Sequence, residues 1–562
     1  MVMIEQIGNV KLDYTFYSGN DYYSDGDEIE NQLLNIVKNG NREDALKQGN
    51  SWPILYHLTD MRKNLIEWYP FHKDGEVLEI GSGCGAISGI LCDKVKEVTC
   101  IELSKRRSVI NAYRNRDCSN LKIMVGNFKD IRLNKKFDYI TLIGVLEYAA
   151  LYIGGDKPYK KMLNEMKKYL KPNGKILIAI ENKMGFKYLN GAREDHVGQR
   201  FAGIEDYRFF HGIRTFSKPE LEALLGECKY KNIRFYYPSP DYKLPDTIYS
   251  DARMPNRGEV RIWNMNYSET RIALYNDAIM ADQICRDKVF DYFANSFLAV
   301  VNDDNEDVYY AHYRRTCKKE FQTETLIQCK SGKQVVSKSY LWDVERNYDI
   351  LERMKKWYPV LQTEYTELSY LIPHENGLDN GIQYDYIAGM CAEEEVAKYV
   401  HNIDQMIRKF KQFIKKYYAY DENWLEEFTI TDEYRKVFGD VYVDSFEKSL
   451  KVTNLDLTLQ NIILKEDRAY CIDYEWIFDF PIPCEYVIYR SASSFYNKYN
   501  MYFLKELSKN DFLVKVGVKA KNISIYSKME EKFQEMVYGK NREENYLKNY
   551  VKPSGMIELK GL

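Results

Sequence analysis

Residues 77–91, VLEIGSGCGAISGIL, combine the pattern of a buried strand with a glycine loop and the start of a helix. Gly81, Gly83 and Gly85 alternate along the loop. Glycine lets a backbone turn sharply and approach a ligand closely, so the segment predicts a ligand-binding strand–loop–helix unit. Glycine loops also occur in folds that bind NAD or nucleotide sugars, and the loop alone does not separate these possibilities.

Short apolar runs alternate with polar, helix-like segments throughout residues 76–181. The runs are EVLEI, EVTCIEL, LKIMVG, FDYITLIG and GKILIAIE, and NIRFYYP and NSFLAVV follow as two expected closing strands. Strands that alternate with helices are typical of βαβ units, which build a mostly parallel sheet with helices on both faces. The predicted fold class is therefore α/β, with ligands bound at the carboxyl ends of the strands.

Several polar or aromatic residues stand where these predicted strands end. Glu79 lies on the first strand, and we expect it to orient a ligand through the glycine loop or through water. Glu102 ends the second strand, where a carboxylate can accept hydrogen bonds from both hydroxyls of a ribose. Asn127 and Phe128 follow the third strand and are expected to meet the edge and the face of an adenine.

Together these features resemble class I S-adenosylmethionine (SAM) methyltransferases over roughly residues 50–230. The resemblance rests on E-x-G-x-G-x-G, on the acidic end of the second strand, and on the strand LKPNGKILI. It implies a Rossmann-like seven-stranded sheet and SAM as cofactor, with Gly144 at the end of the fourth strand, under the methyl donor. Asn127 replaces the acidic residue often found at its position in this class.

Methyl transfer places few demands on the protein beyond alignment of an acceptor, because the sulfonium of SAM is already activated. A general base is needed only for an acceptor that loses a proton. Polar residues near strand ends or in the long loop 193–217 are Glu147, Tyr148, Glu181, Asn182 and His196. Glu147 and His196 are the candidate catalytic residues, although His196 is more readily explained as an ordinary loop histidine. The loop is long enough to cover an acceptor.

A second motif lies far from the first, in VTNLDLTLQNIILKEDRAYCIDYEWIFDFPIP at residues 452–483. Asp456 and Asn461 stand five residues apart, and Asp473 follows an apolar run. Phosphoryl transfer needs an aspartate that aligns the acceptor hydroxyl and ligands that hold Mg²⁺ against the phosphates. Asp456 fits the first role, and Asn461 and Asp473 fit the second. The same residues also suit a turn and a cap in an unrelated domain.

This motif resembles the kinase-like fold of aminoglycoside and choline phosphotransferases over about residues 303–510. The resemblance implies ATP and Mg²⁺ as cofactors, with Lys338 in KQVVSKSYL on the phosphates and Glu345 as the partner of that lysine. Asn454 replaces the histidine of the family's loop, and no glycine-rich loop precedes Lys338. Both an active kinase and an inactive docking domain therefore remain open.

The predicted architecture is a Rossmann-like seven-stranded methyltransferase sheet followed by a bilobal α+β kinase-like domain. We expect a methyltransferase domain over residues 1–302, with N-terminal helices and an insertion near 240–293. The kinase-like domain is expected over 303–515, and a helical, polar tail over 516–562.

Composition excludes several other classes of function. The 562 residues carry a formal net charge of −3 without a long basic block, so nucleic acid binding is not indicated. The 11 cysteines form no CxxC pair, and no apolar stretch reaches the roughly 18 residues of a membrane span. We expect free thiols, no signal peptide, and a cytoplasmic protein or one peripheral to the inner face of the membrane.

A methyltransferase joined to a kinase-like domain resembles the bifunctional enzymes that end lipopolysaccharide O-antigen chains. The resemblance implies a glycan or sugar-phosphate acceptor in a bacterial cell-surface polysaccharide pathway, with glycosyltransferases of that pathway as partners. Two alternatives remain: a methyltransferase with an inactive docking domain, or a non-catalytic scaffold for polysaccharide assembly.

Overall fold

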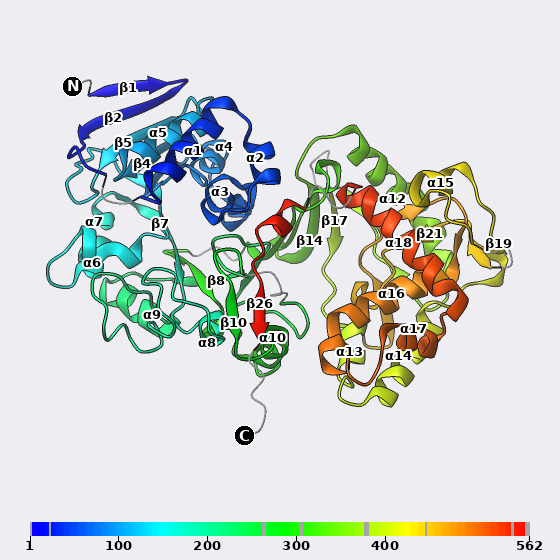
Figure 1. Ribbon diagram of the computed structural model, residues 1–562. Helices are drawn as coiled ribbons and strands as arrows, with labels where there is room; N and C mark the ends of the chain where they lie inside the picture. Colours follow the sequence, from blue (N-terminus) through cyan, green and yellow to red (C-terminus); the bar gives the residue numbers. More distant parts are fainter. Residues whose placement is uncertain are drawn as a thin grey trace. The chain divides into compact units, whose positions relative to one another are not determined.

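The computed structural model describes residues 3–21, 24–260, 266–303, 307–375, 381–443, 447–540 and 545–556. The chain divides into two compact units, one formed by Met1–Tyr313 with Tyr546–Leu562 and the other by Arg314–Asn545 (Figure 1). The division falls later than the boundary expected at residue 302. It also assigns the last part of the expected tail to the first unit.

The first unit is built on a large mixed sheet. Its strands in chain order are β1 (Ile4–Ile7), β2 (Val10–Phe16), β3 (Glu76–Ile80), β4 (Glu97–Glu102), β5 (Leu121–Gly126), β6 (Phe137–Ile143), β7 (Leu170–Glu181), β8 (Arg234–Ser239), β9 (Thr247–Ser250), β11 (Ser296–Val301) and β12 (Val308–Arg314). Seven of them, in the order β5-β4-β3-β6-β7-β11-β8, form the expected core with both closing strands. The sheet continues at one edge through β2 and β1, and at the other through β9 and β12.

The order of the central strands creates a switch point between β3 and β6. The chain proceeds from β3 to β4 and β5 on one side, then returns to pair β6 parallel with β3 on the other. The helices that follow β3 and β4 therefore diverge from those around β6 and β7, which opens a crevice at the carboxyl ends of β3 and β6. The apolar runs of these strands are almost fully buried, as expected for parallel strands covered on both faces.

Helices of the first unit lie between and beside these strands (Figure 1). They are α1 (Asp27–Asn39), α2 (Arg42–Gln48), α3 (Trp52–Leu58), α4 (Ser88–Lys94), α5 (Lys105–Arg114), α6 (Ala149–Tyr152), α7 (Pro158–Lys168), α8 (Phe186–Leu189), α9 (Lys218–Glu227), α10 (Asp277–Arg286) and α11 (Phe290–Phe293), with the 3₁₀ turns η1 (Asp60–Leu65) and η2 (Leu146–Tyr148). The N-terminal hairpin β1–β2 was not expected, because only helices were predicted before the glycine loop.

The C-terminal segment returns to the first unit. Within the expected insertion, β10 (Arg271–Ala273) pairs in parallel with β26 (Ser554–Met556), which Figure 1 shows in red beside the green insertion. The buried hydroxyl of Tyr550 donates a hydrogen bond to the Leu46 carbonyl at 3.0 Å. The first unit is therefore completed by residues that follow the second unit in sequence.

The second unit begins with an antiparallel sheet and continues into a helical part. The sheet contains β13 (Thr323–Lys330), β14 (Lys333–Tyr340), β17 (Gly381–Asp385) and β16 (His374–Glu375), and α12 (Glu345–Glu364) follows β14. The remaining helices are α13 (Ala392–Ala397), α14 (Ile403–Tyr417), α15 (Asp432–Phe438), α16 (Cys484–Tyr499), α17 (Lys509–Val516) and α18 (Ile523–Tyr538). Short strands between them are β15 (Ser369–Tyr370), β18 (Met390–Cys391), β19 (Leu425–Glu427), β20 (Lys448–Leu450), β21 (Thr453–Asn454), β22 (Ile462–Lys465), β23 (Arg468–Cys471), β24 (Ile477–Phe478) and β25 (Ile482–Pro483).

Helix α18 shows that the expected tail over 516–562 is not polar throughout. Tyr526, Met529, Phe533 and Val537 share one helical face and are buried in the core of the second unit. The Phe533 ring packs edge-on against Trp476, with 5.2 Å between the ring centroids. Five charged residues, Lys528, Glu530, Glu531, Lys532 and Glu535, are interspersed between these positions and make the apolar stripe less visible in the sequence.

Two expectations from composition concern the chain as a whole. The cysteines are free thiols, as expected. In the part of the chain that the structure describes, no helix combines the length and the apolar character needed to cross a membrane.

Candidate functional site

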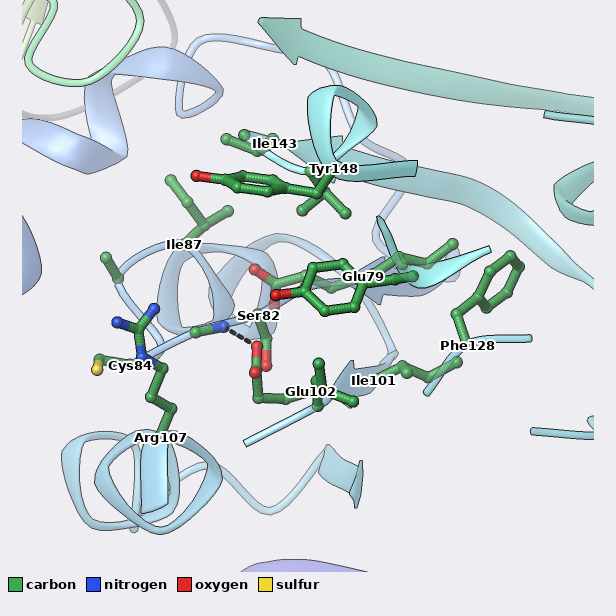
Figure 2. A pocket seen from close by; sticks show the side chains of 18 of the residues that line it. Glu79, Ser82, Cys84, Ile87, Ile101, Glu102, Arg107, Phe128, Ile143 and Tyr148 are labelled. Carbon is green, nitrogen blue, oxygen red and sulfur yellow. Dashed lines mark hydrogen bonds between the residues drawn. The ribbon is translucent and has the colours of Figure 1, made fainter. Parts of the chain in front are cut away.

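A pocket occupies the crevice at the carboxyl ends of β3, β4 and β6 (Figure 2). The sequence-predicted residues that line it are Glu79, Gly81, Gly83, Glu102, Asn127, Phe128 and Gly144. Figure 2 shows Glu102 and Tyr148 on opposite sides of the pocket, with Phe128 at one end and Cys84 at the other. Predicted residues from four separate segments of the sequence thus meet at the predicted edge of the sheet.

The glycine loop needs its glycines for packing as well as for ligand access. Gly81 has a φ of +75°, and a Cβ there would lie 2.4 Å from Val145 Cγ2. Gly85 has a φ of +77°, and a Cβ there would lie 2.2 Å from the side-chain oxygen of Asn111. Gly85 does not line the pocket, so its role is the close approach of the loop to α5.

Glu102 carries a carboxylate whose two oxygens are both held by the backbone. Its Oε2 accepts a hydrogen bond from the Gly83 N–H at 2.7 Å, and its Oε1 accepts one from the Ser104 N–H at 2.9 Å. Burial raises the pKa of Glu102, while these N–H groups and the nearby Arg107 oppose the rise. Each oxygen keeps a further lone pair, so the carboxylate can accept hydrogen bonds from a diol.

Glu79 lies beneath the loop and connects three elements. Its Oε2 accepts hydrogen bonds from the Ser88 hydroxyl on α4, at 2.6 Å, and from the Cys100 thiol on β4, at 3.1 Å. Burial raises its pKa to about 7, because the two hydrogen bonds only partly offset the loss of solvent. These contacts suit a residue that orients the loop.

Asn127 and Phe128 follow β5 and line the pocket together. The Asn127 amide donates to the Tyr152 carbonyl at 3.1 Å and accepts from the Lys129 N–H at 3.1 Å. Its side chain is thus engaged by the chain itself, which limits its capacity to bind an adenine edge. The Phe128 ring, only 6% exposed, remains as an apolar surface for a flat ligand.

Sequence reasoning missed the part of the pocket contributed by the N-terminal helices, by α5 and by α6. The additional lining residues include Tyr56, His57, Arg62, Arg107 and Tyr152. Arg62 is buried, and its guanidinium carbon lies 4.3 Å from the centre of the Tyr56 ring. No local motif marks these residues, because they reach the pocket through tertiary packing.

The two candidate bases of the first unit belong to a buried cluster beside this pocket. His196 Nε2 lies 3.4 Å from Glu147 Oε1 and 3.7 Å from Glu181 Oε2, and its Nδ1 lies 2.9 Å from Glu194 Oε1. Burial lowers the pKa of His196, but the surrounding carboxylates outweigh this effect and hold its pKa well above the usual value. A protonated imidazole cannot accept a proton, which weighs against His196 as a free general base.

The second unit also brings its predicted residues together. Lys338 Nζ on β14 lies 3.1 Å from Asp473 Oδ1 and 2.8 Å from Glu475 Oε2. Burial lowers the pKa of Lys338, but the charges on Asp473 and Glu475 outweigh it and raise the pKa above the ordinary value. Lys338 and Asp473, distant in sequence, therefore share one site as predicted.

The expected partner of Lys338, however, is replaced. Glu345 is exposed at the start of α12, whereas Glu475 is buried beside Lys338. Arg314 Nη2 donates to both oxygens of Glu475, at 2.9 and 3.0 Å, and the Tyr340 hydroxyl donates at 2.7 Å. These donors stabilise Glu475 as a buried carboxylate beside Lys338.

The loop around Asp456 is held by side chains as well as backbone groups. Asn454 accepts a hydrogen bond from the Asp456 N–H at 2.8 Å, and Asn461 donates to the Asp456 carbonyl at 2.8 Å. The Trp476 N–H donates to Asp456 Oδ2 at 2.9 Å. Burial, reinforced by the charges of Asp473 and Glu475, raises the pKa of Asp456 to about 7.

Comparison with known proteins agrees with the geometry of the first unit. Residues 78–176 match the family model described as a methyltransferase domain. The chain is 35% identical over 136 residues to an uncharacterized methyltransferase of Staphylococcus carnosus (strain TM300), a match covering 24% of this chain and 60% of that protein. It is 25% identical over 114 residues to the ribosomal RNA small subunit methyltransferase A of Malacoplasma penetrans (strain HF-2), covering 20% and 41%. The chain thus spans less than two thirds of the length of these two relatives, and its similarity to methyltransferases lies within the first unit.

Two solved methyltransferase structures are similar to parts of this chain at low identity. The phosphoethanolamine N-methyltransferase 1 of Haemonchus contortus is 10% identical, with a TM-score of 0.28, and the match covers 48% of this chain and 49% of that chain. The N-methyltransferase NodS of Bradyrhizobium japonicum WM9 is 14% identical, with a TM-score of 0.25, covering 50% and 100%. Likeness at this level carries no information about the substrate of this chain.

The raised pKa of Glu79 predicts a pH-dependent stability of the first unit. The folded state binds a proton at this carboxyl up to about pH 7, whereas a carboxyl in the unfolded chain releases it near its ordinary pKa of 4.5. Stability from this group is therefore fully present below pH 4.5 and is lost as the pH rises through 7, by about 3 kcal/mol in all. In Glu79→Gln this loss should disappear.

Urea unfolding between pH 5 and 8 measures this difference. We expect Glu79→Gln to become more stable relative to the wild type as the pH rises, and the exposed control Glu227→Gln to follow the wild type. Parallel pH profiles for wild type and Glu79→Gln would show that burial does not perturb this carboxyl.

Proposed function

We propose that the first unit is a SAM-dependent methyltransferase. The observation that carries this proposal is the Glu102 carboxylate, oriented by the Gly83 and Ser104 N–H groups beside the glycine loop of a methyltransferase domain. A carboxylate fixed in this way is suited to the two ribose hydroxyls of SAM. Both oxygens are oriented and removed from bulk solvent before the ligand binds.

The rest of the pocket fits the other parts of SAM. Phe128 offers an apolar surface for the adenine. Arg62 has a buried Nε that finds no hydrogen-bond partner among the described residues, and a guanidinium suits the carboxylate of the methionine part. When bound, SAM supplies an activated methyl group, so the residues of the chain bind the donor and orient an acceptor.

The acceptor side of the proposed reaction lies next to Tyr148. The Tyr148 ring lines the pocket and packs edge-on against His196, with 5.4 Å between the ring centroids. An acceptor that reached the methyl group from this side would meet Glu147 and His196. We propose a bacterial cell-surface polysaccharide or its sugar or phosphate precursor as this acceptor, with glycosyltransferases of the pathway as partners. This choice is supported by the sequence resemblance to O-antigen chain-terminating enzymes.

A second candidate function, phosphotransfer to the same acceptor, is favoured by the site of the second unit. Lys338, Asp456 and Asp473 approach one another although they come from distant segments. A lysine of this kind suits phosphate oxygens, and Asp473 with Asn461 suits Mg²⁺. An inactive docking domain is the alternative, because Asp473 and Glu475 already neutralise the charge of Lys338.

The proposed methyl transfer predicts labelled glycan. With SAM that carries a radioactive methyl group, we expect the wild type to label glycans extracted from cells that lack this protein. Glu102→Ala should label them at least tenfold less, since it removes the anchor of the donor. Labelling that increases when ATP is added would couple the two units in one pathway. Absence of label from glycans, with label on another class of molecule, would refute the proposed acceptor.

Donor binding itself tests Glu102 and Arg62. By isothermal titration with S-adenosylhomocysteine, we expect Glu102→Ala and Arg62→Gln each to raise Kd about tenfold or more, as the loss of a hydrogen bond to a charged group costs roughly 1.5–3 kcal/mol. The exposed control Glu227→Gln should bind like the wild type. A wild type that does not bind S-adenosylhomocysteine would contradict the proposed function.

Nucleotide binding separates the two roles of the second unit. If it is a phosphotransferase, Mg²⁺–ATP should bind the wild type and bind Asp473→Asn at least tenfold more weakly, because a metal ligand is lost. Asp440→Asn, at an exposed position of the same unit, is the matched control. If the wild type and Asp473→Asn bind Mg²⁺–ATP equally, or if neither binds it, the phosphotransferase role is contradicted and the docking role is supported.

A further inference from the structure

The cluster of Glu147, Glu181 and His196 has the geometry of a metal site. One ligand atom from each residue lies within 4.8 Å of the other two. The contacts from His196 Nε2 to the two carboxylates, 3.4 and 3.7 Å, exceed the usual length of an N–H···O hydrogen bond. Ligand atoms about 2.1 Å from a metal ion at tetrahedral angles stand roughly 3.4 Å apart. The spacing therefore leaves room for an ion between the three groups.

The carboxylates of this cluster are buried without sufficient partners. The side chain of Glu147 is 1% exposed and that of Glu181 is fully buried. Among the described residues, Glu147 Oε2 and Glu181 Oε2 accept no hydrogen bond. Leaving a buried carboxylate oxygen without a hydrogen bond destabilises the folded state. A ligand that binds these oxygens would offset this cost.

The charges around the cluster are not balanced. Ion pairs connect His196 and the ammonium groups of Lys187 and Lys243 to carboxylates. The carboxylates joined in this way are Glu147, Glu181, Glu194, Asp195 and Asp241. Five acidic groups thus meet two ammonium groups and one imidazole, which leaves an excess of negative charge that a divalent cation would offset.

The orientation of His196 supports the same conclusion. Its Nδ1 is engaged by Glu194, whose Oε2 is itself held by the N–H groups of His196 and Val197, each at 2.8 Å. A carboxylate on one ring nitrogen is the usual support of a histidine that binds metal through the other. Nε2 is thereby directed toward Glu147 and Glu181.

We propose that Glu147, Glu181 and His196 bind a divalent metal ion beside the donor pocket. Two carboxylates and one imidazole suit Mn²⁺ or Zn²⁺ better than Mg²⁺, which prefers oxygen ligands throughout. Binding requires the neutral imidazole and releases its proton. Resting on the proposed methyl transfer, we further assign the ion the role of holding an oxygen of the acceptor on the Tyr148 side of the pocket.

Manganese titration tests the site. Free Mn²⁺ gives an electron paramagnetic resonance signal that disappears on binding, so the metal-free chain can be titrated directly. The Asp473→Asn background removes a possible competing ligand of the second unit. We expect one Mn²⁺ per chain in this background, and binding at least tenfold weaker after adding Glu181→Gln, Glu147→Gln or His196→Gln. Adding Glu227→Gln, an exposed carboxylate of the same unit, should change nothing.

S-adenosylhomocysteine binding, measured on the same proteins, reports whether the first unit is folded. A folded variant with weakened Mn²⁺ binding supports the site, and three ligand positions allow for one that fails to fold. The proposal is overturned if the background chain binds neither Mn²⁺ nor Zn²⁺, or if folded ligand variants bind Mn²⁺ like the background. If the wild type binds Mn²⁺ but not S-adenosylhomocysteine, the result supports the metal site and contradicts the proposed methyltransferase function.

Discussion

The hydrogen bond from the Gly83 N–H to the Glu102 carboxylate is the constraint on which the donor pocket depends. It ties the loop after β3 to the end of β4, beside the switch point between β3 and β6. Because the Ser104 N–H holds the other oxygen, the carboxylate cannot turn away from the pocket. The carboxylate is therefore ordered before a ligand binds, so that binding does not lose conformational entropy at this side chain.

Buried carboxylates recur at the strand ends of both units, but each is compensated differently. Glu102 relies on backbone N–H groups, Glu79 on a hydroxyl and a thiol, and Glu475 on Arg314 and Lys338. Cationic partners keep Glu475 charged by lowering its pKa, whereas Glu79 and Asp456 have a pKa of about 7. Strongly perturbed carboxyl groups of this kind are typical of sites that bind or react.

Local patterns in the sequence were sufficient for much of this description. The strands β3 to β7, the glycine loop and Glu102 were predicted because alternation and glycine spacing are encoded over a few neighbouring residues. Partners set by tertiary packing were not predictable in this way. Lys338 pairs with Glu475 and not with Glu345. Arg314 and Tyr340 donate hydrogen bonds to Glu475, and these bonds stabilise its buried carboxylate beside the lysine. Arg62 reaches the pocket from a segment with no motif, and the apolar face of α18 is masked by its charged residues.

The pairing of β26 with β10 has a consequence for the order of folding. The second unit is inserted between two parts of the first, so the chain leaves the first unit after Tyr313 and rejoins it at Tyr546. On the ribosome, Arg271–Ala273 emerges long before its parallel partner Ser554–Met556. The first unit must therefore wait with an unpaired strand edge until translation has passed the whole of the second unit, during which time chaperones can act on that edge.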